Sequence, residues 1–457
     1  MSPTFLRLTI VIATSACAQI GPQTNALPDA PSAPLVLRVQ AAQPAPAPTP
    51  AAGTSQRPAA APTAITLDQA IELALKNNPG LKATRTEVEQ SKAQEITAGL
   101  RPNPLLSGDS QFLPIFNPSQ FTTDTLNTLS QFDVGVGYLF ERGGKRQARM
   151  RAARDQTAVT AAQVTDAERA LKFNVAQQFV AALLARSNLA FAEQDLNGFQ
   201  ETVNISQERY RAGDISQSDL LKITLQLLQF QTDVAAARVA KAQALISLRQ
   251  LLGYESVPRE YDVAGDLEFA PVTLSEQDLE AKALTERPDL KAARLGVTAA
   301  GSQAGLARAN GKQDVDVTLN FSHVSSVSST SWFANMPLPI FNRNQGEIQR
   351  TRSAEEQARL AATAAEEGAL ADVRDAYEAA TNNGDVVKLY TSGYLKQAQD
   401  SRDISDYAYR HGAATLLDLL DAERSYRATQ LAYRQALAAY MVSIEQLRQA
   451  VGTRSLP

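Results

Sequence analysis

The chain has 457 residues, a formal charge of −4 at pH 7 and a sequence pI of about 5.5. This near balance leaves no basic surface of the kind that nucleic acids require, so nucleic acid is excluded as a partner. The sequence has one cysteine, Cys17, which excludes a disulfide within the chain. It has two histidines, His323 and His411, which are too few for a zinc site built from cysteine and histidine. We predict no cofactor.

Residues 1–18 have the pattern of an export signal, in which Arg7 precedes a short apolar run and small residues. No stretch reaches the apolar length of a membrane helix, so we expect no inner-membrane helix. Ala16-Cys17-Ala18 fits cleavage before Gln19, whereas Thr14-Ser15-Ala16-Cys17 resembles a lipobox, which would make Cys17 a lipidated first residue. Residues 19–65 are rich in Pro and Ala, which predicts a disordered linker.

The first folded segment is predicted over 66–253. It begins with helices at 66–77, which ends at Asn78-Pro79, and at 81–100. Apolar residues alternate with mostly polar or small ones in QFDVGVGYLF (131–140), which predicts a strand. A weaker strand is expected at 104–112, with an exposed loop between the two. A helix of about 70 residues then runs from Gly143-Gly144 to Ala212, roughly 105 Å of helix. A return helix at 216–252 completes a helical hairpin over 143–252.

The second folded segment, 274–453, repeats this order. LSEQDLEAKALTERPDLKAA (274–293) matches TLDQAIELALKNNPGLKATR (66–85) when Pro288 is set on Pro79. A helix at 289–310 leads to strands at 314–322 and 330–336. A second helical hairpin, 344–451, is expected from a continuous helix at 344–410 and a return helix at 415–451. The chain is therefore predicted to be mostly α, with a small β part and two duplicated halves.

The bends of both hairpins carry related sequences. YRAGDISQSDLL (210–221) and YRHGAATLLDLL (409–420) share six residue types when Gly213 is set on Gly412. Glycine tolerates the positive φ that is common where a helix ends.

Four predicted strands per chain cannot close a barrel, so we expect strands of several chains to combine. In the strand at 314–322, Asp314, Asp316 and Asn320 alternate with apolar residues, which is typical of a barrel with lipid outside and water inside. Trp332, Phe333 and Tyr138 are candidates for the membrane interface. A soluble sandwich with one hydrated face is the alternative.

The junctions FERGGKRQARMRAA (140–153) and PLPIFNRNQGEIQRTRSA (337–354), together with both glycine bends, resemble those of TolC-type outer-membrane efflux proteins. The resemblance covers about 66–453 and favours the branch that serves heavy-metal exporters of the resistance-nodulation-division type. It implies a homotrimer with a 12-stranded transmembrane β-barrel in outer-membrane lipid. The long helical hairpins would continue it as a periplasmic α-barrel.

The second bend matches the family pattern G-x-x-T-x-x-D-x-x-D-A at Gly412, Thr415, Asp418, Asp421 and Ala422. In the family, the aspartates of this pattern form a ring around the periplasmic mouth. Asp219 takes the place of Asp418 in the first hairpin. The resemblance thus implies a periplasmic gate of Asp418, Asp421 and Asp219, and the alternative is a solvated helix face. Some members carry a latch arginine two residues after this glycine, where this chain has Ala414.

The bends also resemble the tips that meet a periplasmic adaptor protein. These adaptor-docking residues would be Arg211, Gly213, Asp214, Arg410, His411 and Gly412. A simpler interpretation is a glycine bend whose arginine offsets the helix dipole. His411 is interpreted as a surface residue rather than a metal ligand.

The sequence has no phosphate loop, no nucleophile elbow and no plausible nucleophile with a histidine base, so we predict that the protein is not an enzyme. The resemblance implies the passive outer-membrane duct of a tripartite efflux pump, with an adaptor and an inner-membrane transporter as partners. Heavy-metal cations are the expected cargo. Organic compounds or a type I secretion substrate are alternatives, and a non-conducting periplasmic coiled-coil scaffold is an alternative of another class.

Overall fold

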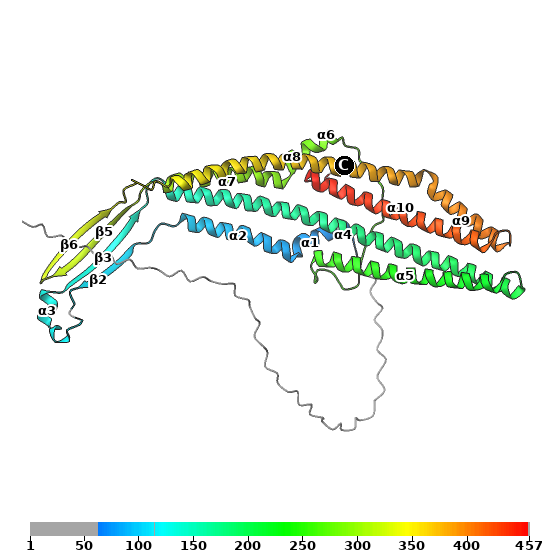
Figure 1. Ribbon diagram of the computed structural model, residues 1–457, viewed down its shortest axis with the longest axis horizontal. Coiled ribbons are helices and arrows are strands. Elements are labelled where there is room, and N and C mark those ends of the chain that lie inside the picture. The colour runs from blue at the N-terminus through cyan, green and yellow to red at the C-terminus, as the bar shows by residue number, and fades with distance from the viewer. Residues whose placement is uncertain (1–62, 114, 456–457) are drawn as a thin grey trace, which may run out of the picture. The chain divides into compact units, whose positions relative to one another are not determined.

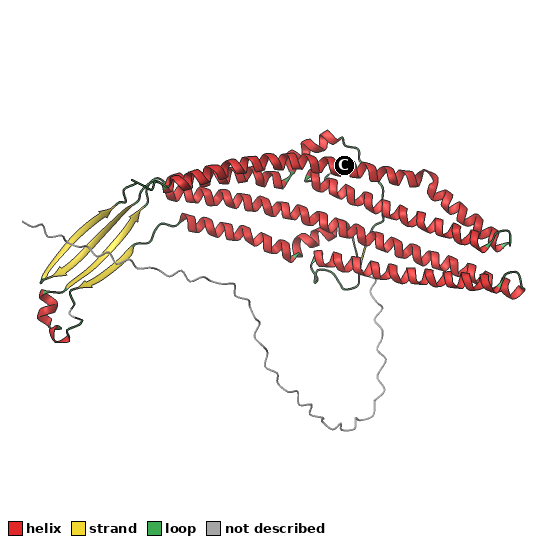
Figure 2. Cartoon of the chain, viewed as in Figure 1, coloured by secondary structure: helices red, strands yellow, loops and turns green. Residues whose placement is uncertain are grey.

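Two long helical hairpins and a four-stranded sheet dominate residues 63–113 and 115–455, which the computed structural model describes (Figures 1 and 2). The predicted signal peptide, Cys17 and the linker up to residue 62 lie outside the described residues. None of the helices in the described ranges combines the length and apolar character needed to cross a bilayer.

The first half contains three strands and five helices, and a 3₁₀ turn at Pro118–Gln120. In chain order these are β1 (Thr63–Ile65), α1 (Leu67–Asn77), α2 (Pro79–Gly99), β2 (Leu105–Gln111), α3 (Thr123–Thr128), β3 (Gln131–Phe140), α4 (Lys145–Ala212) and α5 (Gln217–Leu252). The Thr66 side chain caps α1, and Asn78 caps α2, whose first residue is Pro79. Gly213, with φ of 87°, ends α4.

The second half contains β4 (Tyr261–Val263), α6 (Glu276–Glu286), α7 (Pro288–Asn310), β5 (Val315–Val324), β6 (Val327–Asn335), α8 (Gln345–Leu389), the π-helix η2 (Tyr390–Tyr394), α9 (Leu395–Arg410) and α10 (Leu416–Val451). Gly412 has φ of 76° at the second bend. A glycine with positive φ therefore stands at each of the two predicted bends.

The structure corrects the sequence predictions on four points: the end of the linker, a strand that was not predicted, the loop between β2 and β3, and the helix predicted over 344–410. The linker was predicted to extend to Ile65, but Thr63–Ile65 pair in parallel with Tyr261–Val263, a strand that the sequence did not predict. The predicted loop between β2 and β3 contains a 3₁₀ turn and α3. The helix predicted over 344–410 is not continuous, because Gly393 has φ of 141° and a π-turn divides it. The strand pairing accounts for β1 and β4, the Thr122 side-chain cap for the start of α3, and the Gly393 backbone angle for the divided helix.

The four-stranded sheet is antiparallel in the order β2-β3-β5-β6. Cross-strand register places Val134 beside Phe321 and Val136 beside Leu319, all exposed on one face. The opposite face pairs Gly135 with Asn320 and Asp133 with Ser322. The sheet thus has one apolar and one polar face, and β2 and β6 are its edges.

The apolar residues of the helices are buried in several clusters along their length rather than in one core. One cluster joins α1, α4, α5 and β4, with Val175, Leu248 and Val263 fully buried. Another joins both hairpins near their bends, where Phe199 and Phe230 stack at 4.4 Å beside Tyr409. Within the chain, neighbouring helices in this region follow the order α9, α10, α4, α5.

Candidate functional site

The two bends lie side by side and are joined by Arg209 of α4. Its guanidinium donates to the Tyr409 carbonyl oxygen at 2.5 Å and lies over the Tyr409 ring at 5.2 Å. The Ser206 and Tyr409 hydroxyls are 3.1 Å apart. The structure therefore brings together the two segments that sequence repetition had singled out.

The six predicted docking residues are at or beside these bends, and most are exposed. Arg211 forms an ion pair with Glu208 at 2.6 Å, and Arg410 forms one with Asp406 at 2.8 Å. The His411 ring lies against the Tyr407 ring, tilted by 33° and with 4.1 Å between centroids. Within the described ranges, no group of three or more His, Cys, Asp and Glu side chains could hold a metal ion.

Asp418 and Asp219 occupy equivalent helix N-termini. The Thr415 hydroxyl donates to an Asp418 carboxylate oxygen at 2.6 Å, and the Thr415 N–H donates to the same oxygen at 3.0 Å. These bonds lower the pKa of Asp418 below its ordinary value. The Ser216 hydroxyl likewise donates to Asp219 at 2.8 Å. Both carboxylates therefore stabilise the start of a return helix, in addition to any role at a mouth.

Asp421 differs from the other two carboxylates because it has no capping role. Its side chain is 62% exposed, and its ion pair with Arg424 is long, at 3.6 Å. Such exposed pairs contribute little to stability. Asp421 is thus the predicted gate residue whose charge can be removed with the least structural cost.

Sequence reasoning missed a charged cluster between the hairpins. It is built around the buried Asp195 and Glu423 and completed by the partly buried Asp233, Arg402 and Arg427. Arg427 of α10 contacts the Asp195 carboxylate of α4 at 2.7 Å and also pairs with Asp233 of α5. A signal was present, because Asp195 is four residues from both Phe191 and Phe199, a spacing that places it on a buried helix face.

Glu423 is the member of this cluster with the most perturbed acidity. Burial, and next the nearby Asp195 carboxylate, raise the pKa of Glu423 to about 7, although Arg402 and Arg427 oppose the shift. One of its carboxylate oxygens is buried without a hydrogen-bond partner among the described residues. The cluster therefore links three helices through one arginine and contains a carboxyl group that titrates near neutral pH.

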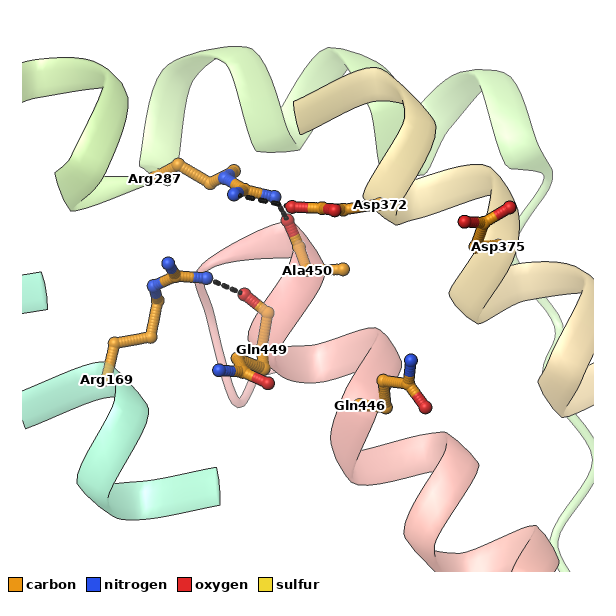
Figure 3. Close-up of a pocket in the computed structure, with 7 residues that line it drawn as sticks. All are labelled: Arg169, Arg287, Asp372, Asp375, Gln446, Gln449 and Ala450. Atoms are coloured by element: carbon orange, nitrogen blue, oxygen red, sulfur yellow. Dashed lines mark hydrogen bonds and ion pairs between the residues drawn. The ribbon is translucent and has the colours of Figure 1, made fainter. Parts of the chain in front are cut away.

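A second polar site surrounds the C-terminal end of α10 (Figure 3). Arg287 donates to the Ala450 carbonyl oxygen at 3.0 Å, and Arg169 donates to that of Gln449 at 2.5 Å. Arg287 also pairs with Asp372 of α8 at 2.9 Å. The adjoining cavity has a volume of about 300 Å³. Since both arginines are bonded to protein groups, this site fastens α10 to its neighbours.

A family model described as outer membrane efflux protein matches residues 70–254 and 279–453. The cation efflux system protein CusC of Escherichia coli strain K12 is 26% identical over 400 residues, which cover 84% of this chain and 85% of that protein. The pyoverdine export outer membrane protein OpmQ of Pseudomonas putida is 25% identical over 407 residues, with coverages of 84% and 85%. The cobalt-zinc-cadmium resistance protein CzcC of Cupriavidus metallidurans is 25% identical over 384 residues, with coverages of 82% and 87%.

A crystal structure of CusC is similar to this chain with a TM-score of 0.69 at 24% identity, and covers 85% of this chain and 92% of that one. The predicted resemblance and fold class are confirmed by these findings.

Proposed function

The chain belongs to the outer membrane efflux protein family, whose members are channels, and we propose that three copies form a passive duct from periplasm to exterior. The observation that carries this proposal is the sheet. Its apolar face is exposed, with Trp332 74% exposed, and both edge strands lack a partner in the described chain. Twelve strands from three copies would pair these edges and turn the apolar faces toward lipid.

The flanks of the helices support the same assembly. On α5, exposed apolar residues recur at spacings of four, three, eleven and seven, which all fit the a and d positions of a coiled-coil seam. They are Leu221, Leu225, Leu228, Val239 and Ile246. On α8 and α9 the corresponding residues are Val386, Leu389, Ile404 and Tyr407. Because α5 and α9 are the outer helices of the order α9, α10, α4, α5, each flank of one copy would meet the other flank of the next.

In this assembly the bends would surround the periplasmic mouth. Asp418, Asp421 and Asp219 from three copies would approach one axis, where carboxylates attract cations and repel each other. We expect the docking residues around Arg211 and Arg410 to meet a periplasmic adaptor, which would connect the duct to an inner-membrane transporter of the resistance-nodulation-division type.

Heavy-metal cations are the proposed cargo, because the junction sequences resemble those of metal exporters and the relatives include a cation efflux protein and a cobalt-zinc-cadmium resistance protein. Organic solutes are the second candidate, since a pyoverdine export protein matches at nearly the same identity. Growth of a deletion strain on cobalt, zinc and copper salts, beside growth with organic toxicants, separates the two.

Conductance in planar lipid bilayers tests the duct. We expect discrete steps from the purified protein, and larger steps with weaker cation preference from Asp418→Ala/Asp421→Ala, which removes charge and volume from the mouth. Thr415→Ala is the matched control, because it weakens the same helix cap and keeps both carboxylates. Unchanged steps and selectivity in the double variant would refute the gate. Silence from folded wild-type trimers would refute the duct and favour the scaffold.

A crosslinking experiment tests the tips. Arg211→Glu changes an exposed side chain without altering the glycine backbone, and we expect it to reduce crosslinking to the adaptor while trimers still form. Arg238→Glu, an equally exposed change elsewhere in the first hairpin, is the control. Equal crosslinking in both variants would count against docking at the tips.

A further inference from the structure

Positive charge is distributed very unevenly around the sheet. Residues 102–141 and 313–342, which include all four strands of the sheet and the loops at its far end, contain no lysine or arginine. The residues that flank these two segments are all basic: Arg101, Arg142, Lys312 and Arg343. Each is in one of the four connections between sheet and helices, and we call this set the basic collar.

The collar residues lie at the same end of the sheet. Leu105 begins β2 opposite Gly137 near the end of β3, and Phe140, the last residue of β3, pairs with Val315, the first of β5. Asn335 at the end of β6 pairs with Asp316. The loops at the other end carry Asp124 and no basic side chain.

Three other basic residues at this junction form ion pairs, and Arg146 donates to the Gly99 carbonyl oxygen at 2.6 Å. Lys145 contacts Asp314 at 2.6 Å, Arg149 pairs with Glu141, and Arg350 contacts Glu347 at 2.6 Å. The first two pairs fasten a strand end to the start of α4, whereas Arg350 and Glu347 both lie in the first turns of α8. The three pairs thus neutralise three carboxylates at the junction. They also leave the collar as an excess of positive charge.

The four collar side chains are exposed, and none forms an ion pair among the residues that the structure describes. The Arg142 guanidinium donates to Met336 Sδ at 3.4 Å, and the Arg142 backbone N–H donates to an Asp314 carboxylate oxygen at 2.9 Å. Arg343 donates only to the Pro339 carbonyl oxygen from its side chain, at 3.0 Å. The Lys312 stem passes so close to Gly143 that a Cβ there would lie 2.6 Å from the Lys312 Cγ. Gly143 thus leaves room for the path that Lys312 takes to solvent.

Exposed apolar side chains accompany the collar. Leu100 precedes Arg101, Phe140 lies two residues before Arg142, and Phe341, 89% exposed, lies two residues before Arg343. Side chains with an apolar body below a positive charge are typical of membrane interfaces, where the charge reaches the headgroups. Of these apolar residues, Phe140 belongs to the apolar face of the sheet, because it lies six residues after Val134 on the same strand.

We propose that the basic collar binds the headgroups of anionic phospholipids in the periplasmic leaflet and thereby fixes the depth of the sheet in the membrane. This inference rests on the proposed function, because it requires the apolar face to contact lipid. The leaflet follows from the location of the helices in the periplasm. Guanidinium and ammonium groups complement phosphate, and an anionic headgroup adds net charge that a zwitterionic one lacks.

Trp332, the only tryptophan, provides the reporter, because it is exposed on the apolar face three residues before the collar end of β6. In the full-length trimer, brominated phosphatidylglycerol and brominated phosphatidylcholine are compared as quenchers of its fluorescence. For the wild type we expect about fivefold preference for the anionic lipid. That preference should fall as salt is raised from about 0.05 M to about 0.5 M.

Two charge-matched variants test the assignment. Arg101→Gln/Arg142→Gln/Lys312→Gln/Arg343→Gln should lower the preference to about one. Lys92→Gln/Arg294→Gln/Arg359→Gln/Arg374→Gln, which removes four exposed charges from the helices, should retain it. Arg101→Lys/Arg142→Lys/Arg343→Lys should also retain it. Circular dichroism and trimer size confirm folding.

The outcomes separate the two proposals. Two results would overturn the collar alone, provided that phosphatidylcholine quenches Trp332 normally. One is a wild type without preference for the anionic lipid, and the other is a collar variant that keeps the full preference. Absence of quenching by either lipid in folded wild-type trimers overturns the lipid-facing sheet and the collar together.

Discussion

The two helical hairpins share the same order of elements and a related bend sequence, and they differ in their outgoing helix. Their return helices, α5 and α10, both have 36 residues and both start with a hydroxyl cap. The outgoing helices differ, because α4 runs for 68 residues without interruption whereas the second is divided into α8 and α9 by the turn at Gly393 (Figure 1). Counted back from the bends, Gly393 corresponds to Gln194. The two halves thus have the same bend and the same return helix, and they differ in whether the outgoing helix is continuous.

The buried cluster compensates for this difference by fastening the divided hairpin to the continuous one. Arg427→Ala would leave Asp195 buried without its ion pair, and we expect a loss of about 3–5 kcal/mol in the free energy of unfolding. Denaturant titration of the purified protein measures it. Arg424→Ala, one turn earlier and 82% exposed, should change stability by less than about 0.5 kcal/mol. Equal losses in the two variants would contradict a central role for Arg427.

Glu423 makes the stability of this contact depend on pH. Its pKa of about 7 in the folded protein exceeds its ordinary value of 4.5, so ionisation destabilises the fold as pH rises through this range. Glu423→Gln should therefore stabilise the protein by about 3 kcal/mol above pH 7, with the gain vanishing as pH falls below 4.5. Unfolding titrations across this range measure the slope. A flat profile for Glu423→Gln would refute the assignment.

The turn in the second hairpin can be tested with two glycines in the same outgoing helix. Gly393→Ala should cost about 1–3 kcal/mol, because φ of 141° strains any residue with a Cβ. Gly368→Ala lies in regular α8 with open space around its Cβ, and should stabilise by about 0.5–1 kcal/mol. Unfolding free energies of both variants decide the matter. A gain at Gly393 would mean that the helix straightens readily.

The bends provide the smallest effects. Ser216→Ala and Thr415→Ala should each cost about 1 kcal/mol through loss of a helix cap. The effect at Ser216 should be the larger, because the backbone N–H of residue 415 can still donate to Asp418 after Thr415→Ala. Hydrogen exchange of the first turns of α5 and α10 would show the difference locally. Faster exchange only at α10 would contradict the expected order.

Much of this architecture could be predicted from sequence because it rests on local signals. Alternation gave the bounds of β3 correctly, and Pro79, Gly213 and Gly412 marked helix ends through their restricted or permitted backbone angles. The sequence did not reveal β1 and β4, since each has three residues and is defined by the other. Gly393 was hidden because an isolated glycine is compatible with a regular helix.

In the candidate site, too, the features with a local sequence signal could be predicted and those that depend on contacts between helices could not. The bends were predicted from the repeat, and their aspartates from the resemblance to the family pattern. The structure adds that Asp418 and Asp219 cap helices. The roles of these aspartates at a mouth remain predictions. The cluster around Arg427 could not be assembled from sequence, because its members come from four helices and only their shared burial brings them together.

The pairing of β3 with β5 joins the two halves of the chain, each of which contributes one pair of strands. In the proposed trimer, β6 of one copy would meet β2 of the next in the same antiparallel sense, so the ring has six nearly equivalent seams. Three of these are covalently tied through the segment that connects α5 to α7. The pairing of β3 with β5 over ten residues within one chain is consequently the arrangement that we expect to recur between β6 and β2 of neighbouring copies. A single half, freed from this tie, would need six copies to close the same ring.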